Sequence, residues 1–157
     1  MKITAAELRA MQKPTAAILV GIDPGSVCTG LAIVRDGEPP ILKGFKSHCE
    51  AILFAQAFVQ EVGRQNIHFV LEDARKVTKN AWFAKQNGGR KDQGAGYVKA
   101  LSKDWQCFCE LIKVPYTLKA PNSAITKWEA DRFEKTYGIK TLKGEHHLRD
   151  AFNLIAA

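Results

Sequence analysis

Residues 20–26 of the chain are Val-Gly-Ile-Asp-Pro-Gly-Ser, and they overlap the end of an apolar run over residues 16–22. A short apolar run bounded by turn residues predicts a buried strand. The strand ends in a carboxylate, Asp23, and Pro24-Gly25 then turns the chain. A charged group at the end of a buried strand is costly unless it is paired or binds something. This stretch therefore predicts that Asp23 has a ligand.

The size and charge of the chain limit the classes of protein to consider. Its 157 residues suffice for one domain with a sizeable core, and its hydrophobic content of 46% is ordinary for a globular protein. The 23 Lys and Arg outnumber the 16 Asp and Glu, which gives a net charge of +7. Such an excess suits a polyanion such as nucleic acid. The alternative is a basic but merely solvated surface, because a sum does not show clustering.

The sequence indicates neither a membrane protein nor a disulfide-rich secreted one. No apolar run approaches the roughly 20 residues that a membrane-spanning helix needs. Charged residues interrupt the N-terminal extension, residues 1–15, so we expect a short helix or a frayed arm there and no signal peptide. The four cysteines match neither zinc-binding pairs nor a disulfide pattern. They favour free thiols in a cytoplasmic, reducing compartment.

Strand patterns alternate with helix patterns along the chain, which predicts a single α/β domain with crossover connections. The predicted strands are residues 17–23, 28–35, 41–46, 67–72 and 114–118. The predicted helices are residues 49–64, 93–113, 126–137 and 145–156.

Basic and small polar residues replace the hydrophobic pattern over residues 75–92, which predicts a basic loop. Trp82 and Phe83 lie at its centre, and exposed rings beside Lys and Asn suit stacking on unpaired bases. The alternative is a solvated loop without a ligand. The candidate DNA-binding residues of the loop are Arg75, Lys76, Lys79, Asn80, Trp82, Phe83, Lys85, Arg90 and Lys91.

Two further carboxylates lie at places that resemble that of Asp23. Glu72 ends the fourth predicted strand, and Asp150 lies on the last helix, with His147 one turn before it on the same face. Gathered acids repel one another, and divalent cations relieve that cost. Oxygen ligands without thiolates favour Mg²⁺ or Mn²⁺, and two such ions roughly 3.5–4 Å apart can activate a water for phosphodiester cleavage.

Each of these residues also has an ordinary structural interpretation. Asp23 can cap its turn, and Asp150 can be a surface acid that pairs with Arg149 or Lys143. The combination of residues favours the metal site over these separate interpretations.

Two of the candidates have neighbours that compete with them. Asp73 competes with Glu72, but strand alternation sends the two side chains to opposite faces, so only one can join Asp23. We expect Glu72 to be that residue. His146 competes in the same way with His147.

Four segments together resemble a known family: residues 21–26 with Thr29-Gly30, residues 70–72, residues 93–96 at the start of a long helix, and residues 147–151. Their order and spacing resemble the RuvC-type Holliday junction resolvases of the RNase H-like nuclease superfamily. The resemblance spans residues 17–157. It implies an RNase H-like fold, with a central mixed five-stranded sheet flanked by helices, and a homodimer. We expect the helix at residues 93–113 to form the dimer face.

The resemblance also implies an activity. It is Mg²⁺-dependent, structure-selective cleavage of four-way DNA junctions, in recombination, repair or phage DNA processing, with two Mg²⁺ ions for which Mn²⁺ substitutes. By position, the catalytic and metal-binding residues are Asp23, Glu72, His147 and Asp150. Lys119 and Lys127 are implied as further DNA contacts.

The chain departs from the family pattern in the basic loop. Arg75 stands three residues after Glu72, where well-studied bacterial members have an aromatic residue that enters the junction centre. Trp82 or Phe83 would take that role here. The long loop and the N-terminal extension indicate a phage-type or otherwise divergent member.

Other functions share parts of this pattern. A nuclease of flaps, forks or ribosomal precursor RNA would use the same acids. An actin-like or sugar-kinase ATPase shares the strand-Asp-Gly opening, but it needs two such domains, which 157 residues do not supply. A non-catalytic nucleic-acid-binding module is disfavoured because every expected acid is present.

Overall fold

The computed structural model describes residues 16–77, 90–121 and 128–156, but for residues 90–93 and 95 it gives the backbone alone. Its centre is the predicted mixed five-stranded sheet, and the strand order in it is β3-β2-β1-β4-β5. The strands are β1 (Ile18–Asp23), β2 (Thr29–Arg35), β3 (Ile41–Phe45), β4 (Ile67–Glu72) and β5 (Tyr116–Lys119). Adjacent β1 and β4 run parallel, whereas β1, β2 and β3 pair antiparallel.

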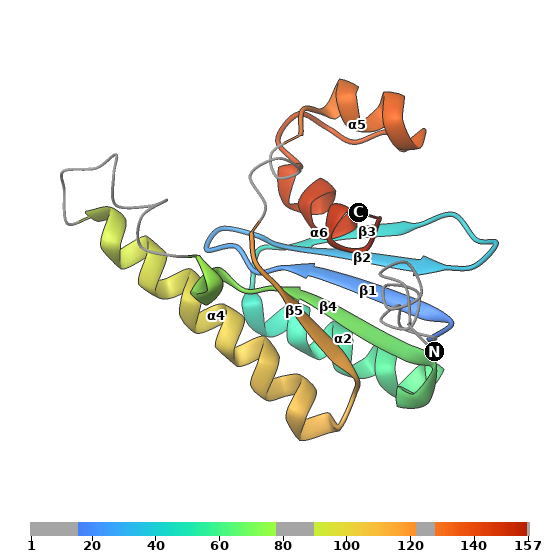
Figure 1. The fold of residues 1–157 in the computed structure, drawn as a ribbon, viewed down its shortest axis with the longest axis horizontal. Coiled ribbons are helices and arrows are strands. Elements are labelled where there is room, and N and C mark those ends of the chain that lie inside the picture. Colours follow the sequence, from blue (N-terminus) through green and yellow to red (C-terminus); the bar gives the residue numbers. More distant parts are fainter. Residues whose placement is uncertain (1–15, 78–89, 122–127, 157) are drawn as a thin grey trace, which may run out of the picture.

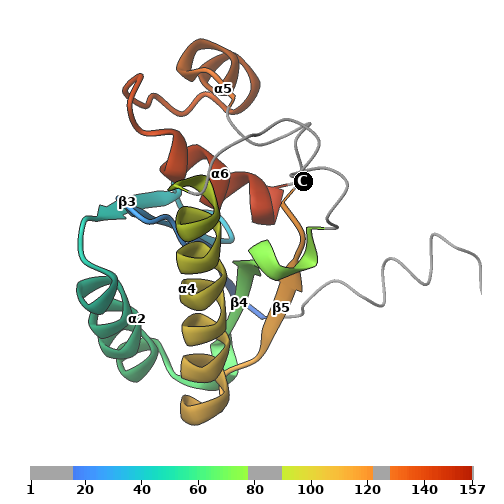
Figure 2. The ribbon, with the colours of Figure 1, turned by 90° about the vertical axis from the view of Figure 1, so that its left-hand side faces the viewer.

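Helices cover both faces of this sheet (Figures 1 and 2). The helices α2 (His48–Val62) and α4 (Arg90–Ile112) pack on one face, and α5 (Ala130–Tyr137) and α6 (His146–Ala156) lie on the other. Two short 3₁₀ helices, η1 (Arg64–Asn66) and η2 (Ala74–Lys76), flank β4. The result is a three-layer α/β domain, which is the predicted fold class.

Strand alternation divides the apolar residues between two cores. Ile22, Phe69 and Leu71 are fully buried on the α2/α4 side, where Trp105 of α4 packs against them. A smaller cluster around Ala32, Phe133, Ala151 and Phe152 lies on the α5/α6 side. Because neighbouring residues of a strand point to opposite faces, the residues that follow Ile22 and Leu71 are directed toward α6.

The observed element ends differ from the expected ones around the basic loop. The loop was expected over residues 75–92, but η2 already contains Arg75 and Lys76, and α4 begins at Arg90. Asp73 accepts a hydrogen bond from the backbone N–H of Arg75, which starts the short helix in place of a loop. The helix expected from residue 126 begins at Ala130. Residues 78–89 and the N-terminal extension lie outside the described residues.

The structure also bears on membrane-spanning helices and on the state of the cysteines. No helix among the described residues is long and apolar enough to cross a bilayer. The four cysteines are free thiols, with Cys109 buried in the main core and Cys49 and Cys107 exposed.

The helix α6 sits unusually close to β1 and β2 because two glycines face it. A Cβ on Gly21 would collide with the backbone oxygen of Ala151, and a Cβ on Gly30 would collide with that of His147. These two positions admit no side chain unless the helix moves. The glycines of the opening motif therefore set the distance between α6 and the sheet.

We expect Gly21→Ala to lower the free energy of unfolding by about 1–3 kcal/mol, the usual cost of overpacking a tight interface. The matched control is Gly96→Ala in α4, where a Cβ would meet nothing within 4 Å. Replacing a helical glycine by alanine there should stabilise the protein by roughly 0.5–1 kcal/mol. Urea unfolding of both variants measures the difference. Equal stability of Gly21→Ala and the wild type would show that the close packing of α6 on β1 does not contribute to stability.

Candidate active site

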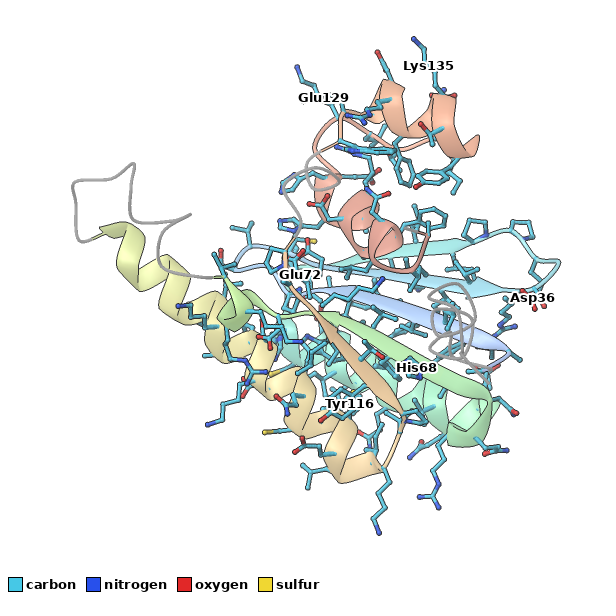
Figure 3. The ribbon with its side chains drawn as sticks, viewed as in Figure 1. Asp36, His68, Glu72, Tyr116, Glu129 and Lys135 are labelled. Atoms are coloured by element: carbon cyan, nitrogen blue, oxygen red, sulfur yellow. The ribbon has the colours of Figure 1, made fainter. Side chains whose placement is uncertain are left out.

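Asp23 and Glu72 meet at one edge of the sheet. The parallel register pairs Ile22 of β1 with Leu71 of β4, so the next residue of each strand is an acid at the same level. Asp23 is only 6% exposed, and its carboxyl group is hydrogen-bonded to that of Glu72. Figure 3 shows Glu72 at the end of β4, on the side of the sheet that α6 covers.

Asp150 brings a third acid to this place from α6. It is 7% exposed, and its charge acts on Glu72. The close packing of α6 on Gly21 and Gly30 carries it there, since both glycines lie on the sheet face that α6 covers. Three carboxyl groups from two strands and one helix thus form one acidic cluster: Asp23, Glu72 and Asp150.

The cluster holds a proton at neutral pH. Burial, and then the charges of Asp23 and Asp150, raise the pKa of Glu72 to about 8. The Oε2 atom of Glu72 is buried and has no hydrogen-bond partner among the described residues. A buried oxygen without a partner and a carboxyl group forced to stay neutral are both unfavourable. Both would be relieved by a cation.

His147 joins the cluster through Asp23. Its Nδ1 atom lies 2.6 Å from Oδ2 of Asp23. This hydrogen bond raises the pKa of His147, although burial opposes the shift. The ring also packs against the turn after β1, since a Cβ on Gly25 would collide with it. The ring of His146 contacts that of His147 in a tilted arrangement, with centroids 4.0 Å apart, and burial lowers the pKa of His146.

Asp73 does not join the cluster. It accepts hydrogen bonds from Nε and Nη2 of Arg75 at 2.7 and 3.0 Å, on the side of the strand end opposite to Glu72. The structure therefore brings together the acids at positions 23, 72 and 150 with His147, and it leaves Asp73 in a separate ion pair.

The cluster is not a preformed metal centre. Among the residues that the structure describes, no three Asp, Glu, His or Cys side chains are arranged to hold a metal ion. The donor chemistry nevertheless fits a hard divalent cation, because carboxylate oxygens are its preferred ligands. The unpartnered Oε2 of Glu72 is one such donor.

Three of the proposed DNA contacts donate hydrogen bonds within the chain. Arg75 binds Asp73, the Nζ atom of Lys76 donates to the Leu118 carbonyl at 2.7 Å, and Nζ of Lys119 donates to the Leu154 carbonyl at 2.6 Å. The other proposed contacts have side chains outside the described residues: Lys79, Asn80, Trp82, Phe83, Lys85, Arg90, Lys91 and Lys127.

Two buried polar residues beside the cluster were not singled out from the sequence. Arg149 is 2% exposed and donates to the backbone oxygens of Trp128, Leu142 and Lys143, which ties the segment before α6 to the helix. Ser102 of α4 is 1% exposed and contacts the backbone at Glu72. The only sequence signal that Ser102 is buried was its place on the apolar face of a predicted helix. For Arg149 the sequence pattern indicated an exposed residue.

The arrangement of these elements is shared with a protein of solved structure. The structure of Thermus thermophilus RuvC in complex with a Holliday junction substrate matches with a TM-score of 0.53 and 19% sequence identity, over 88% of this chain and 89% of that one. The fold is RuvC-like. A second structure of Thermus thermophilus RuvC matches with a TM-score of 0.48 and 19% sequence identity, over 88% of this chain and 90% of that one. No protein-family model matches the sequence, and no curated protein shows significant sequence similarity to it.

The raised pKa of Glu72 predicts how the stability of the metal-free, RuvC-like domain depends on pH. The folded pKa of about 8 lies above the unfolded value near 4.5, so the folded state binds more protons between these two pH values. The free energy of unfolding in EDTA should therefore fall as pH rises through this window, by up to about 5 kcal/mol from this group. His147, whose pKa is also raised, adds to the fall in the same direction.

Urea unfolding at half-unit pH steps measures this effect as the difference between the wild type and Glu72→Gln. The variant should lose most of the decline and be more stable than the wild type at pH 8. Parallel profiles for the two proteins would contradict the assignment of a shared proton to Glu72.

Proposed function

We propose that this protein is a divalent-metal-dependent endodeoxyribonuclease that cuts branched DNA, with the four-way junction as its substrate. The observation that carries the proposal is the meeting of Asp23, Glu72 and Asp150 at one edge of a RuvC-like sheet. Gathering three largely buried acids costs stability. That cost is explained if the acids serve cations that act on a phosphodiester.

Two observations support DNA as the substrate. The net charge of +7 favours a polyanionic partner. One solved structure with a similar fold is a complex of RuvC with a Holliday junction substrate. The residues proposed to contact DNA are those of the segment 78–91 together with Lys127, because Arg75, Lys76 and Lys119 are engaged within the chain.

The proposed roles follow from the geometry of the cluster. Asp23, Glu72 and Asp150 would hold the ions, with Oε2 of Glu72 as an available donor. When bound, Mg²⁺ or Mn²⁺ supplies activation of the attacking water and neutralises charge on the departing oxygen. His147 orients Asp23 through the 2.6 Å contact between Nδ1 and Oδ2. A homodimer would place two such sites on the two strands of a symmetric junction.

We expect Asp23→Asn to abolish cleavage while junction binding in Ca²⁺ persists, because the variant loses a charge of the cluster and leaves the basic residues unchanged. The measurement uses labelled four-way junctions, flaps, forks, linear duplex and single-stranded RNA, with end mapping on both strands. Asp131→Asn, which changes an exposed acid on α5, is the matched control and should cleave normally.

The products distinguish the candidate activities. Paired symmetric cuts in four-way junctions support the proposal, whereas one-sided cuts assign a flap or fork nuclease. Cleavage of RNA alone would assign a ribosomal-precursor nuclease. Full activity of Asp23→Asn would refute the proposed site, and binding without any cleavage by the wild type would indicate a non-catalytic module.

Metal binding should raise the melting temperature of the wild type. A ligand at a hundredfold excess over its Kd stabilises the folded state by about 2.7 kcal/mol, which corresponds to roughly 5–10 °C for a chain of this size. We expect Mg²⁺ or Mn²⁺ to give this shift, and we expect Glu72→Gln and Asp150→Asn to reduce it strongly. The readout is the difference between the melting temperatures with metal and with EDTA for each variant. An equal shift in all three proteins would place the metal elsewhere.

A further inference from the structure

The backbone just after Glu72 is tied to α4 by a buried hydroxyl group. The hydroxyl proton of Ser102 is shared between the backbone oxygens of Glu72 and Val98, which lie 3.2 and 3.1 Å from Oγ, and Oγ accepts from the backbone N–H of Ala74 at 3.4 Å. Ser102 is 1% exposed, so these contacts are shielded from water. One side chain of α4 thus holds the peptide groups on both sides of Asp73.

A second tie runs through Arg75. Its Nε and Nη2 atoms donate to the two carboxylate oxygens of Asp73, and Nη2 also donates to Oε1 of Gln106 at 2.6 Å. The carboxylate of Asp73 is 4% exposed. The two hydrogen bonds from Arg75 therefore join its guanidinium group to a buried carboxylate as an ion pair.

The second tie is anchored beyond α4 as well. Nε2 of Gln106 donates to the carboxylate of Glu110, and the hydroxyl group of Tyr116 on β5 donates to the same carboxylate at 2.7 Å. The guanidinium group of Arg75 therefore bridges the strand end to a network that joins α4 and β5. Figure 3 shows Tyr116 on β5 beside α4, on the opposite side of the sheet from α6.

The position of Glu72 requires such ties. Glu72 is the last residue of β4, and its carboxyl group reaches that of Asp23 only while the end of this strand stays in place. Its strand is paired with β1 on one side and with only the four residues of β5 on the other. The end of β4 therefore depends on contacts with α4 to hold its position.

We propose that Arg75 is a positioning residue, which together with Asp73, Ser102 and Gln106 forms a clamp that holds the end of β4 on α4 and keeps Glu72 beside Asp23. This inference rests on the proposed nuclease function and gives Arg75 a different role from a DNA contact. Three of the hydrogen bonds that its five N–H groups can make are used inside the chain. Arg75, three residues after Glu72, therefore positions the Glu72 carboxyl group and does not contact the DNA junction.

A double-mutant cycle on Asp73→Asn and Arg75→Gln separates the two roles. Two quantities are measured on a four-way junction: the Kd in Ca²⁺, and the single-turnover cleavage rate in Mg²⁺ at saturating protein. For a clamp, each single variant should cleave about 10–100-fold more slowly, because small displacements of a reacting group have effects of this size. The Kd should stay within about twofold, and the double variant should be no slower than the slower single variant.

Arg64→Gln is the matched control. Arg64 is an exposed arginine of η1, the 3₁₀ helix at the opposite end of β4. It should leave both the Kd and the cleavage rate unchanged. Ser102→Ala tests the first tie independently and should slow cleavage without a change in the Kd.

Other outcomes overturn the proposal. If Arg75→Gln raises the Kd while Asp73→Asn does not, Arg75 is a DNA contact. Unchanged cleavage rates in both single variants, or fully additive losses in the double variant, would show that the two residues do not act as one unit.

Amide hydrogen exchange keeps the clamp testable if the wild type cuts no branched DNA, which would refute the proposed function itself. The backbone N–H of Asp73 donates to the Lys119 carbonyl at 2.7 Å, directly after Glu72. If the clamp holds this strand end, Arg75→Gln should speed exchange at that amide at least about tenfold, through easier local opening. Unchanged exchange at this amide would overturn the clamp whatever the protein cleaves.

Discussion

The site depends on the close contact between α6 and the first two strands. Gly21 and Gly30 leave no side chain between the helix backbone and the sheet, so the helix lies where a Cβ would otherwise be. Because α6 carries His147 and Asp150, its depth decides whether these residues reach Asp23. The two glycines therefore determine the positions of His147 and Asp150 relative to Asp23, although neither glycine has a side chain that could bind a ligand.

The close packing of α6 on β1 and β2 brings Asp150 to Asp23 and Glu72, and gathering these three acids is electrostatically unfavourable. Burial, and then the charges of Asp23 and Asp150, raise the pKa of Glu72 to about 8, and His147 forms a hydrogen bond with Asp23 on one side of the cluster. On the other side, the ion pair of Asp73 and Arg75 ties the strand end to α4. A RuvC-like fold thus holds a cluster that is strained without a cation, which is the physical basis for proposing that it binds one.

Much of the fold was predictable because strands and helices have different hydrophobic periods. The five strands and four helices appear at the expected places, with β4 at residues 67–72 as predicted. The expectation that strand alternation separates Glu72 from Asp73 follows from the same period, and the structure places only Glu72 beside Asp23. The start of α4 was misplaced because glycines and lysines around residue 90 carry no apolar pattern, so periodicity gave no signal there.

The sequence by itself determined which acids end predicted strands, and hence the candidate residues Asp23 and Glu72. The strand order that brings these two acids to one edge came from the tertiary structure. The tertiary structure alone decided where the long cationic side chains go. Arg75, Lys76 and Lys119 look alike in the sequence as exposed cations, yet each donates a hydrogen bond to a group of its own chain. Periodicity reports the direction of a side chain relative to its own strand or helix, whereas the partner of a flexible cation depends on which distant backbone and carboxylate groups the packing brings within its reach.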